Sequence, residues 1–171
     1  MKTIRLLLLP PLLAAAFAVR ADGPALPAAV PPAYRQECAA CHTLYAPRML
    51  PAASWHRIMT GLGRHYGTDA SLDADTVKQL DAWLQAHAMA GGWRTWVKAG
   101  PEAPPEDRIT RSAWFERKHR RIDATVWNHA AVRSAANCAA CHPRADEGDY
   151  DEHGLRFPAG LDARQRRAWR D

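Results

Sequence analysis

The chain has 171 residues, enough for one domain or two small ones, and a formal net charge of +5 at pH 7. Residues 1–21 are typical of a signal peptide, and without Lys2, Arg5 and Arg20 the net charge falls to +2. A net positive charge this small excludes the strongly basic surface that is typical of a nucleic-acid-binding protein.

The N-terminal segment combines a basic start, an apolar run over 6–19 and a small residue, Ala21, at the expected cleavage site. The run is interrupted by Pro10 and Pro11, and it is too short for a bilayer span, which takes roughly 20 apolar residues. No later stretch of the sequence is apolar enough to span. We therefore expect an exported, periplasmic protein with no membrane span after cleavage of the signal peptide.

Helical periodicity recurs along the chain, and sustained alternation of apolar and polar residues is absent. A first helix is predicted over 34–44 and a second over 54–66, with Ser54 as its N-cap. A third is predicted over 73–87, with Asp73 near its positive end. Its buried side is predicted to carry Val77, Leu80 and Leu84.

A proline-rich segment over 99–107 is the best candidate for a domain boundary. We therefore predict, after the signal peptide (1–21), an N-terminal domain (22–100) and a C-terminal domain (101–171). In the second domain, helical regions are predicted over 108–122 and 124–143. They are followed by an acidic loop over 146–152 and a mobile arginine-rich tail from Arg164.

The motif Cys-Ala-Ala-Cys-His occurs twice, at 38–42 and at 138–142, and it is the attachment pattern of c-type haem. Residues three and four apart share one face of a helical turn, so the two cysteines can reach the two vinyl groups on one edge of the porphyrin. The histidine that follows points its ring at the iron. The sequence predicts two covalently bound haem c groups, attached through Cys38, Cys41, Cys138 and Cys141, with His42 and His142 as proximal iron ligands.

Three other interpretations of the cysteines fit less well. A thioredoxin-like redox pair needs a βαβ setting, which the pattern does not indicate. A zinc site usually has roughly 15–20 residues between its two cysteine pairs, whereas 96 residues separate Cys41 from Cys138. Two structural disulfides would leave both trailing histidines unexplained.

The ligand on the far side of the first iron has several candidates. His65 lies three residues after Leu62, on the edge of an apolar stripe of the predicted helix. His56 lies outside that stripe, because successive residues of a helix are turned by about 100°. His87 lies at the C-terminal end of a helix, where it also complements the helix dipole. Periodicity favours His65, with Met59 and His87 next. The full set of candidates is His56, His65, His87, Met49, Met59 and Met89.

For the second iron the candidates are His119, His129 and His153. His119 lies four residues after Phe115 and three before Ile122, so it shares their apolar face despite its position in a basic run. His129 follows Trp127, and His153 lies in the acidic loop. Periodicity favours His119.

The sequence resembles the small dihaem cytochromes c of the DHC family across nearly all of the predicted mature chain. The combination of motifs, more than the haem attachment pattern alone, carries the resemblance. The matching stretches are Glu37–His42, Leu50–Trp55, His65–Gly67 with Asp69 and Ala70, Arg108–Thr110, Trp114 and Phe115 with His119, and Asn137–His142 with Gly148.

The resemblance implies an all-α protein, with an N-terminal domain like a monohaem cytochrome c and a smaller helical haem domain after it. It also implies that each haem iron has two histidine ligands, which places the distal ligands at His65 and His119. Both residues are also the ones that the periodicity favours. Family members act as periplasmic electron-transfer proteins. The resemblance further implies redox-protein partners, among them an oxygen-binding monohaem cytochrome and a b-type membrane cytochrome.

We therefore expect an electron carrier and not an enzyme, with both haems low-spin. The alternative is a small dihaem enzyme, such as a peroxidase, or a gas-binding haem protein with one open iron site. Three tryptophans, Trp55, Trp114 and Trp127, are expected to pack against the haems. The basic stretch 108–133 and the acidic loop 146–152 are candidate docking surfaces for a partner of opposite charge, which predicts electron-transfer rates that fall steeply with salt.

Overall fold

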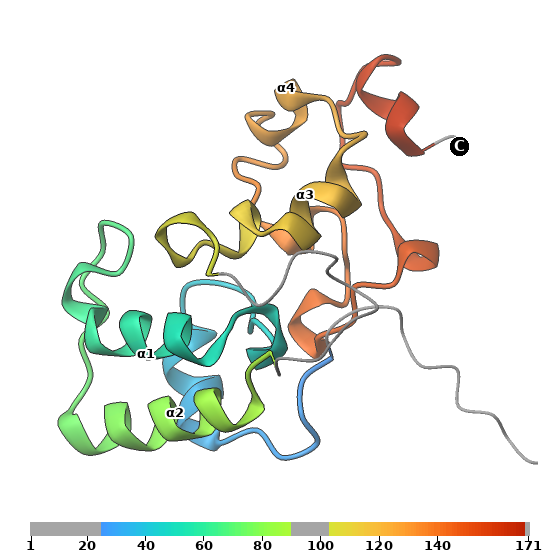
Figure 1. Cartoon of the computed structure of the whole chain (residues 1–171). Coiled ribbons are helices and arrows are strands. Elements are labelled where there is room, and N and C mark those ends of the chain that lie inside the picture. Colours follow the sequence, from blue (N-terminus) through green and yellow to red (C-terminus); the bar gives the residue numbers. More distant parts are fainter. Residues whose placement is uncertain (1–24, 90–102, 170–171) are drawn as a thin grey trace, which may run out of the picture.

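The computed structural model describes residues 25–89 and 103–169, and Figure 1 shows their arrangement. Within these ranges the chain is helical, with two isolated β-bridges, Pro51 with Met89 and His65 with Thr68. The predicted all-helical class is confirmed in these ranges. The division into two domains stays a prediction, because the signal peptide and residues 99–102 of the proposed boundary lie outside the described residues.

The two longest helices, α1 (Ala52–Thr60) and α2 (Ala74–His87), pack against each other in the first half (Figure 1). Asp73 lies at the N-terminal end of α2 as predicted, and it is the N-cap, because its side chain accepts a hydrogen bond from the Thr76 backbone N–H. The prediction of Ser54 as the N-cap of α1 is wrong, since Pro51 holds that position and Ser54 is buried inside the helix. A proline fixes φ and lacks an N–H, so a helix can start directly after it.

The first half closes around one apolar core, to which the segment before the first motif also contributes. A short π-helix, Tyr34–Cys38, leads into the motif, so the predicted helix over 34–44 ends early, and a 3₁₀ turn, Pro47–Met49, follows. Leu80 and Leu84 are buried as predicted, whereas Val77 is only partly buried. The buried core consists of Tyr34, Leu44, Leu50, Trp55, Met59, Leu80 and Leu84.

The predicted helix over 54–66 ends at Thr60, and a tight turn between α1 and α2 carries His65. A 3₁₀ turn, Leu62–Arg64, leads into it, and the His65 backbone N–H donates to the Leu62 carbonyl at 3.2 Å. The backbone then enters the left-handed region, with φ of 50° at Tyr66 and 97° at Gly67. A glycine adopts this conformation without the steric cost that a Cβ brings.

The second half is built from short elements. The helical region predicted over 108–122 is confirmed as a 3₁₀ turn followed by a short helix, whereas most of 124–143 forms turns and not the predicted helical region. The α-helices of this half are α3 (Ala113–His119) and α4 (Ala124–Trp127), capped by Ser112 and Asp123. α3 ends inside the basic run 117–121, where neighbouring like charges oppose a longer helix. The remaining elements are 3₁₀ turns at Pro105–Asp107, Ile109–Arg111, Cys138–Ala140, Ala145–Glu147, Glu152–Gly154 and Gln165–Trp169.

Two smaller clusters complete the packing. One joins the two halves and contains Ala46, Met49, Ala145 and Tyr150. The other belongs to the second half alone and contains Val126, Val132 and Leu161.

The tail that the sequence predicts to be mobile makes two contacts with the N-terminal end of α4. Arg164 pairs with Asp123 at 3.0 Å, and the Gln165 side-chain amide donates to the Thr125 hydroxyl at 3.1 Å. Its mobility stays a prediction.

Gly67→Ala tests the turn that carries His65. A Cβ at this position would meet no atom within 4 Å, so the cost comes from the positive φ alone. We expect a loss of about 1 kcal/mol in the free energy of unfolding, measured by chemical denaturation. Gly154→Ala is the matched control, because a Cβ there also meets nothing and its φ is not positive. Equal stability of the two variants would contradict a strained turn.

Candidate haem sites

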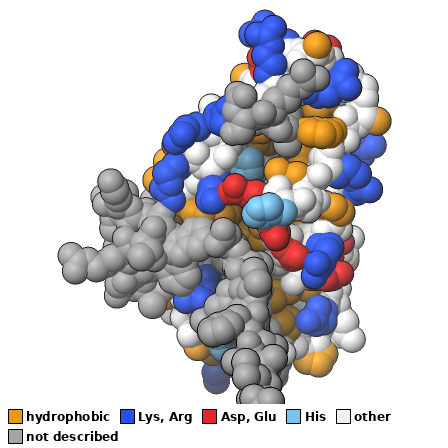
Figure 2. Space-filling model, turned by 90° about the vertical axis from the view of Figure 1, so that its right-hand side faces the viewer, with side chains coloured by type: hydrophobic (Ala, Val, Ile, Leu, Met, Phe, Trp, Pro, Cys, Tyr) orange, Lys and Arg blue, Asp and Glu red, His pale blue; other side chains and the backbone are white. Residues whose placement is uncertain are grey.

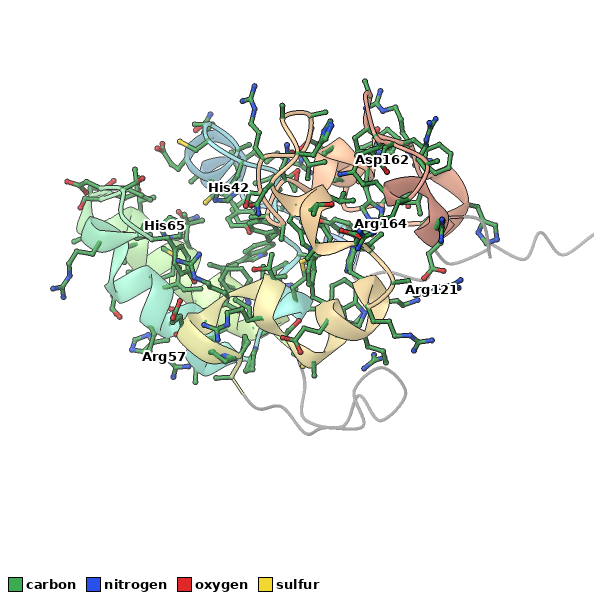
Figure 3. All side chains as sticks on the ribbon, turned by 90° about the horizontal axis from the view of Figure 1, so that it is seen from above. His42, Arg57, His65, Arg121, Asp162 and Arg164 are labelled. Carbon is green, nitrogen blue, oxygen red and sulfur yellow. The ribbon has the colours of Figure 1, made fainter. Side chains whose placement is uncertain are left out.

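The first motif brings His42 opposite His65. The two ring centres lie 6.2 Å apart, with their planes inclined by 29°, and Figure 3 labels both residues. The Nδ1 atom of His42 lies 2.7 Å from the Thr43 carbonyl oxygen. A carbonyl only accepts, so Nδ1 carries the proton and Nε2 keeps its lone pair for a metal.

The second motif brings His142 opposite His119 in the same manner. Their ring centres lie 6.3 Å apart, with an angle of 76° between the planes. Nδ1 of His119 donates to the Phe115 carbonyl one helical turn earlier, at 2.9 Å. The His119 ring also stacks on Phe115, with 4.0 Å between centres. Helix α3 therefore fixes both the position and the tautomer of this imidazole.

The spacing of both pairs suits one metal ion between two imidazoles. Metal–imidazole nitrogen bonds are about 2.0 Å long, so rings on opposite sides of one ion have their centres roughly 6 Å apart. Burial lowers the pKa of His65, His119 and His142, and the neighbouring ring of each pair lowers the pKa of His65 and His142 further. The neutral imidazole that this favours is the form that binds a metal.

The four cysteines form no disulfide. Burial raises the pKa of Cys38 and of Cys138 to about 11, and it also raises the pKa of Cys141. Redox-active and zinc-binding thiols have the opposite shift, toward the thiolate. Within residues 25–89 and 103–169, no group of three or more histidine, cysteine or acidic side chains could hold a metal ion. These surroundings suit uncharged sulfur, as in a thioether.

A cavity of about 470 Å³ lies at the second motif, and its largely apolar lining suits the apolar surface of a porphyrin. His119 and His142 both line it, together with Cys138 and Cys141 of the motif. Two of the three tryptophans predicted to pack on haem, Trp114 and Trp127, belong to this wall. The third, Trp55, is buried in the first core and donates to the Pro47 carbonyl at 2.7 Å.

Two buried polar atoms of the second site, Nδ1 of His142 and the hydroxyl of Tyr150, have no hydrogen-bond partner among residues 25–89 and 103–169. Both residues line the cavity, and their ring centres are 5.6 Å apart. An unpaired buried donor costs about 1–3 kcal/mol. A haem brings two propionates that can accept hydrogen bonds, so the polar groups of this wall also suit it.

The sequence pattern did not indicate three aromatic residues of this wall, namely Tyr45, Tyr150 and Phe157. Tyr45 comes from the first half of the chain, and the other two follow the second motif. No local periodicity marks them, because the chain near them forms turns.

The competing histidines and Met59 lie elsewhere. His56 is exposed and bonds Asp81 at 2.9 Å, and His87 is exposed with Nδ1 2.8 Å from the Trp83 carbonyl. Nδ1 of His129 accepts from the Ala131 backbone N–H at 3.2 Å, and Met59 is buried in the first core. Of the remaining candidates, His153 is exposed beside Asp151, Met49 lies in the cluster that joins the two halves, and Met89 pairs with Pro51.

The chain is helical and has two haem attachment motifs, and the histidine of each motif lies opposite a second histidine. These features define a c-type cytochrome with two haems. The family model for dihaem cytochrome c matches residues 34–150, and the chain belongs to this family. It carries two covalently bound haem c groups, and it is a redox protein for electron transfer.

Solved structures agree with this. The chain is 35% identical to the DHC purified from Rhodobacter sphaeroides, covering 71% of this chain and 98% of that one, with a TM-score of 0.59. It is 31% identical to a dihaem cytochrome c from Shewanella baltica, covering 76% of this chain and 96% of that one, with a TM-score of 0.63. A search of curated proteins found no match.

The described helices include none that combines the length and apolar character needed to cross a membrane.

Replacement of both cysteines of one motif tests haem attachment. Cys38→Ala with Cys41→Ala, and separately Cys138→Ala with Cys141→Ala, should each lower the mass of the denatured protein by one haem, because the remaining motif still forms its thioethers. The intact motif is the internal control in each variant. A variant that retains two covalent haems by mass spectrometry would contradict the assignment.

Proposed function

We propose that this protein is a periplasmic electron carrier in which each haem iron is held between two histidines, His42 with His65 and His142 with His119. The observation that supports this is the near-equal spacing of the two ring pairs, 6.2 and 6.3 Å between centres. The haem supplies one-electron chemistry when bound. Two strong ligands leave no open position for a substrate, which suits a carrier.

The side chains around each pair hold the ligands in place. The carbonyls of Thr43 and Phe115 accept from His42 and His119, and such second partners fix the orientation of a metal-bound imidazole and raise its basicity. The Phe115 and Trp127 rings pack on His119, with centre distances of 4.0 and 5.8 Å. Two nitrogen ligands per iron favour lower midpoint potentials than a histidine and methionine pair.

Export rests on the signal peptide that the sequence predicts. The redox-protein partners, an oxygen-binding monohaem cytochrome and a b-type membrane cytochrome, rest on the family resemblance. The relatives with solved structures are named only as dihaem cytochromes.

Carbon monoxide distinguishes the carrier from its alternative, an enzyme or gas-binding protein with one open iron. We expect the optical spectrum of the reduced protein to stay unchanged with the gas, since both faces of each iron are closed. A shift of either haem in the unaltered protein would contradict the closed sites.

Alanine variants then assign the distal ligands one by one. His65→Ala and His119→Ala should each convert one haem from low-spin to a form that binds carbon monoxide. His87→Ala and His129→Ala are matched controls and should leave both haems low-spin. Electron paramagnetic resonance can identify the altered site, because the ring planes differ by 29° in one pair and 76° in the other. Loss of low-spin character in a control would reassign the ligand.

The charges of the candidate docking surfaces are partly paired within the protein. Glu106 binds both Arg108 and Arg111, Lys118 pairs with Glu152, and Arg144 pairs with Glu147 and Asp149. The face in Figure 2 accordingly shows acidic and basic side chains close together, without a wide area of one sign. Internal pairing leaves less charge to attract a partner.

We therefore expect electron transfer to depend on salt less steeply than the sequence alone predicts. Reduction by dithionite, an anion, should slow only slightly as ionic strength rises. Stopped-flow measurement of the rate over a range of salt concentrations tests this. A steep fall would instead support docking through the basic stretch 108–133.

A further inference from the structure

The loop directly after the first motif is bonded to both sides of the second motif. The Thr43 hydroxyl donates to Oδ1 of Asp146 at 2.7 Å, and Asp146 lies four residues after His142. The Tyr45 hydroxyl donates to the Ala136 carbonyl at 3.0 Å, and Ala136 lies two residues before Cys138. These bonds join residues 103 and 91 positions apart in the chain. Two residues of one loop, Thr43 and Tyr45, therefore hold the two haem motifs against each other.

Within this loop, the Tyr45 side chain contacts both sites. Its ring centre lies 4.9 Å from that of His42, with 31° between the planes. The same side chain lines the cavity of the second site beside Cys138. It packs against the first core and also against the cluster that joins the halves, which contains Tyr150. Tyr150 in turn lies 5.6 Å from His142 by ring centres.

The position of Tyr45 is fixed from two directions. Its hydroxyl is bonded to the second half through Ala136, and its own carbonyl accepts from the Tyr34 hydroxyl at 2.7 Å. Tyr34 is buried in the first core. The aromatic ring is thus anchored to both halves at once, and it contacts groups of both haem sites.

We propose that Tyr45 is the positioning residue that couples the two haem sites, providing the packed path along which one electron passes between them. This rests on the proposed carrier function. In each exchange one iron is oxidised by one unit and the other is reduced by one unit. Tyr45 itself gains and loses neither an electron nor a proton. Its role is to fill the space between the two sites with packed and hydrogen-bonded protein atoms, so that solvent does not enter there.

Tyr66 provides a matched comparison. Its ring centre also lies 4.9 Å from a proposed axial histidine, in this case His65. Its hydroxyl donates to the carbonyls of Glu106 and Asp107, and its side chain is 43% exposed. Tyr66 is not part of the cavity wall of the second site. Loss of its hydroxyl alone should therefore weaken a contact between the halves without affecting exchange between the two sites.

The experiment measures the rate of intramolecular electron exchange in partly reduced holoprotein, by two-dimensional NMR exchange of the haem methyl signals. Tyr45→Leu should slow this exchange several-fold. Tyr45→Phe keeps the ring and loses one hydrogen bond, so it should restore a rate near that of the unaltered protein. Tyr66→Phe keeps the ring beside His65 and loses only the bonds of the hydroxyl to Glu106 and Asp107, so it should leave the rate unchanged. A redox titration of each variant gives the separation of the two midpoint potentials as an independent readout, which Tyr45→Leu should alter.

Thr43→Val separates coupling from simple attachment of the halves. It removes the bond to Asp146 but leaves the Tyr45 ring, so it should lower the thermal stability and preserve the exchange rate. Equal slowing in Thr43→Val, Tyr45→Phe and Tyr45→Leu would overturn the proposal in favour of a purely structural clamp. An unchanged rate in Tyr45→Leu with intact optical spectra would also overturn it. Carbon monoxide binding to the unaltered protein would contradict the carrier function but not a slowed exchange in Tyr45→Leu.

Discussion

Apolar side chains of the second half, among them Phe115, Trp127 and Val132, line a cavity of about 470 Å³, and the architecture of this half follows from that. Its own buried cluster comprises Val126, Val132 and Leu161. Its α-helices have seven and four residues, too few to be stable in isolation. A haem at the second motif, with Cys138 and Cys141 as the proposed attachment sites, would supply the missing apolar surface. We therefore expect folding of this half to be coupled to haem binding, as in small domains that fold around a metal.

The first half does not share this dependence to the same degree, and this explains how the second half is placed. Helices α1 and α2 pack on each other and enclose seven buried residues. The second half then rests on this support through the Thr43 and Tyr45 bonds and through Arg57, whose guanidinium binds the Asp107 carboxylate with two bonds of 2.9 and 2.6 Å. That guanidinium holds the pKa of Asp107 below its usual range. The depressed pKa means that this contribution is present at neutral pH and is lost as the carboxylate protonates in acid.

The two attachment motifs were predictable from local spacing, and the position of His119 from the helical period of α3. His65 faces His42 from a turn beyond the end of α1, so helical period did not predict its position. Helix α2 was also predictable, since Asp73 caps it and its stripe is regular. The second half was not, because its turns are set by packing around the cavity and not by periodicity. Tyr45 and Tyr150 had no local signal either. Their roles come from contacts between segments about 100 residues apart, which no motif or period encodes.

The two sites share one attachment motif and one proposed ligand type, yet the structure holds their rings differently. At the second site, α3 orients His119 by a bond to the preceding helical turn and by stacking on Phe115, inclined by 22°. At the first site, His65 lies in a turn shaped by the positive φ of Tyr66 and Gly67. The motif therefore determines where a haem is attached, whereas the distal element determines how the opposite ring is turned. Because ligand orientation, burial and hydrogen bonding tune a haem iron, two identical motifs can yield two electronically distinct centres in one small chain.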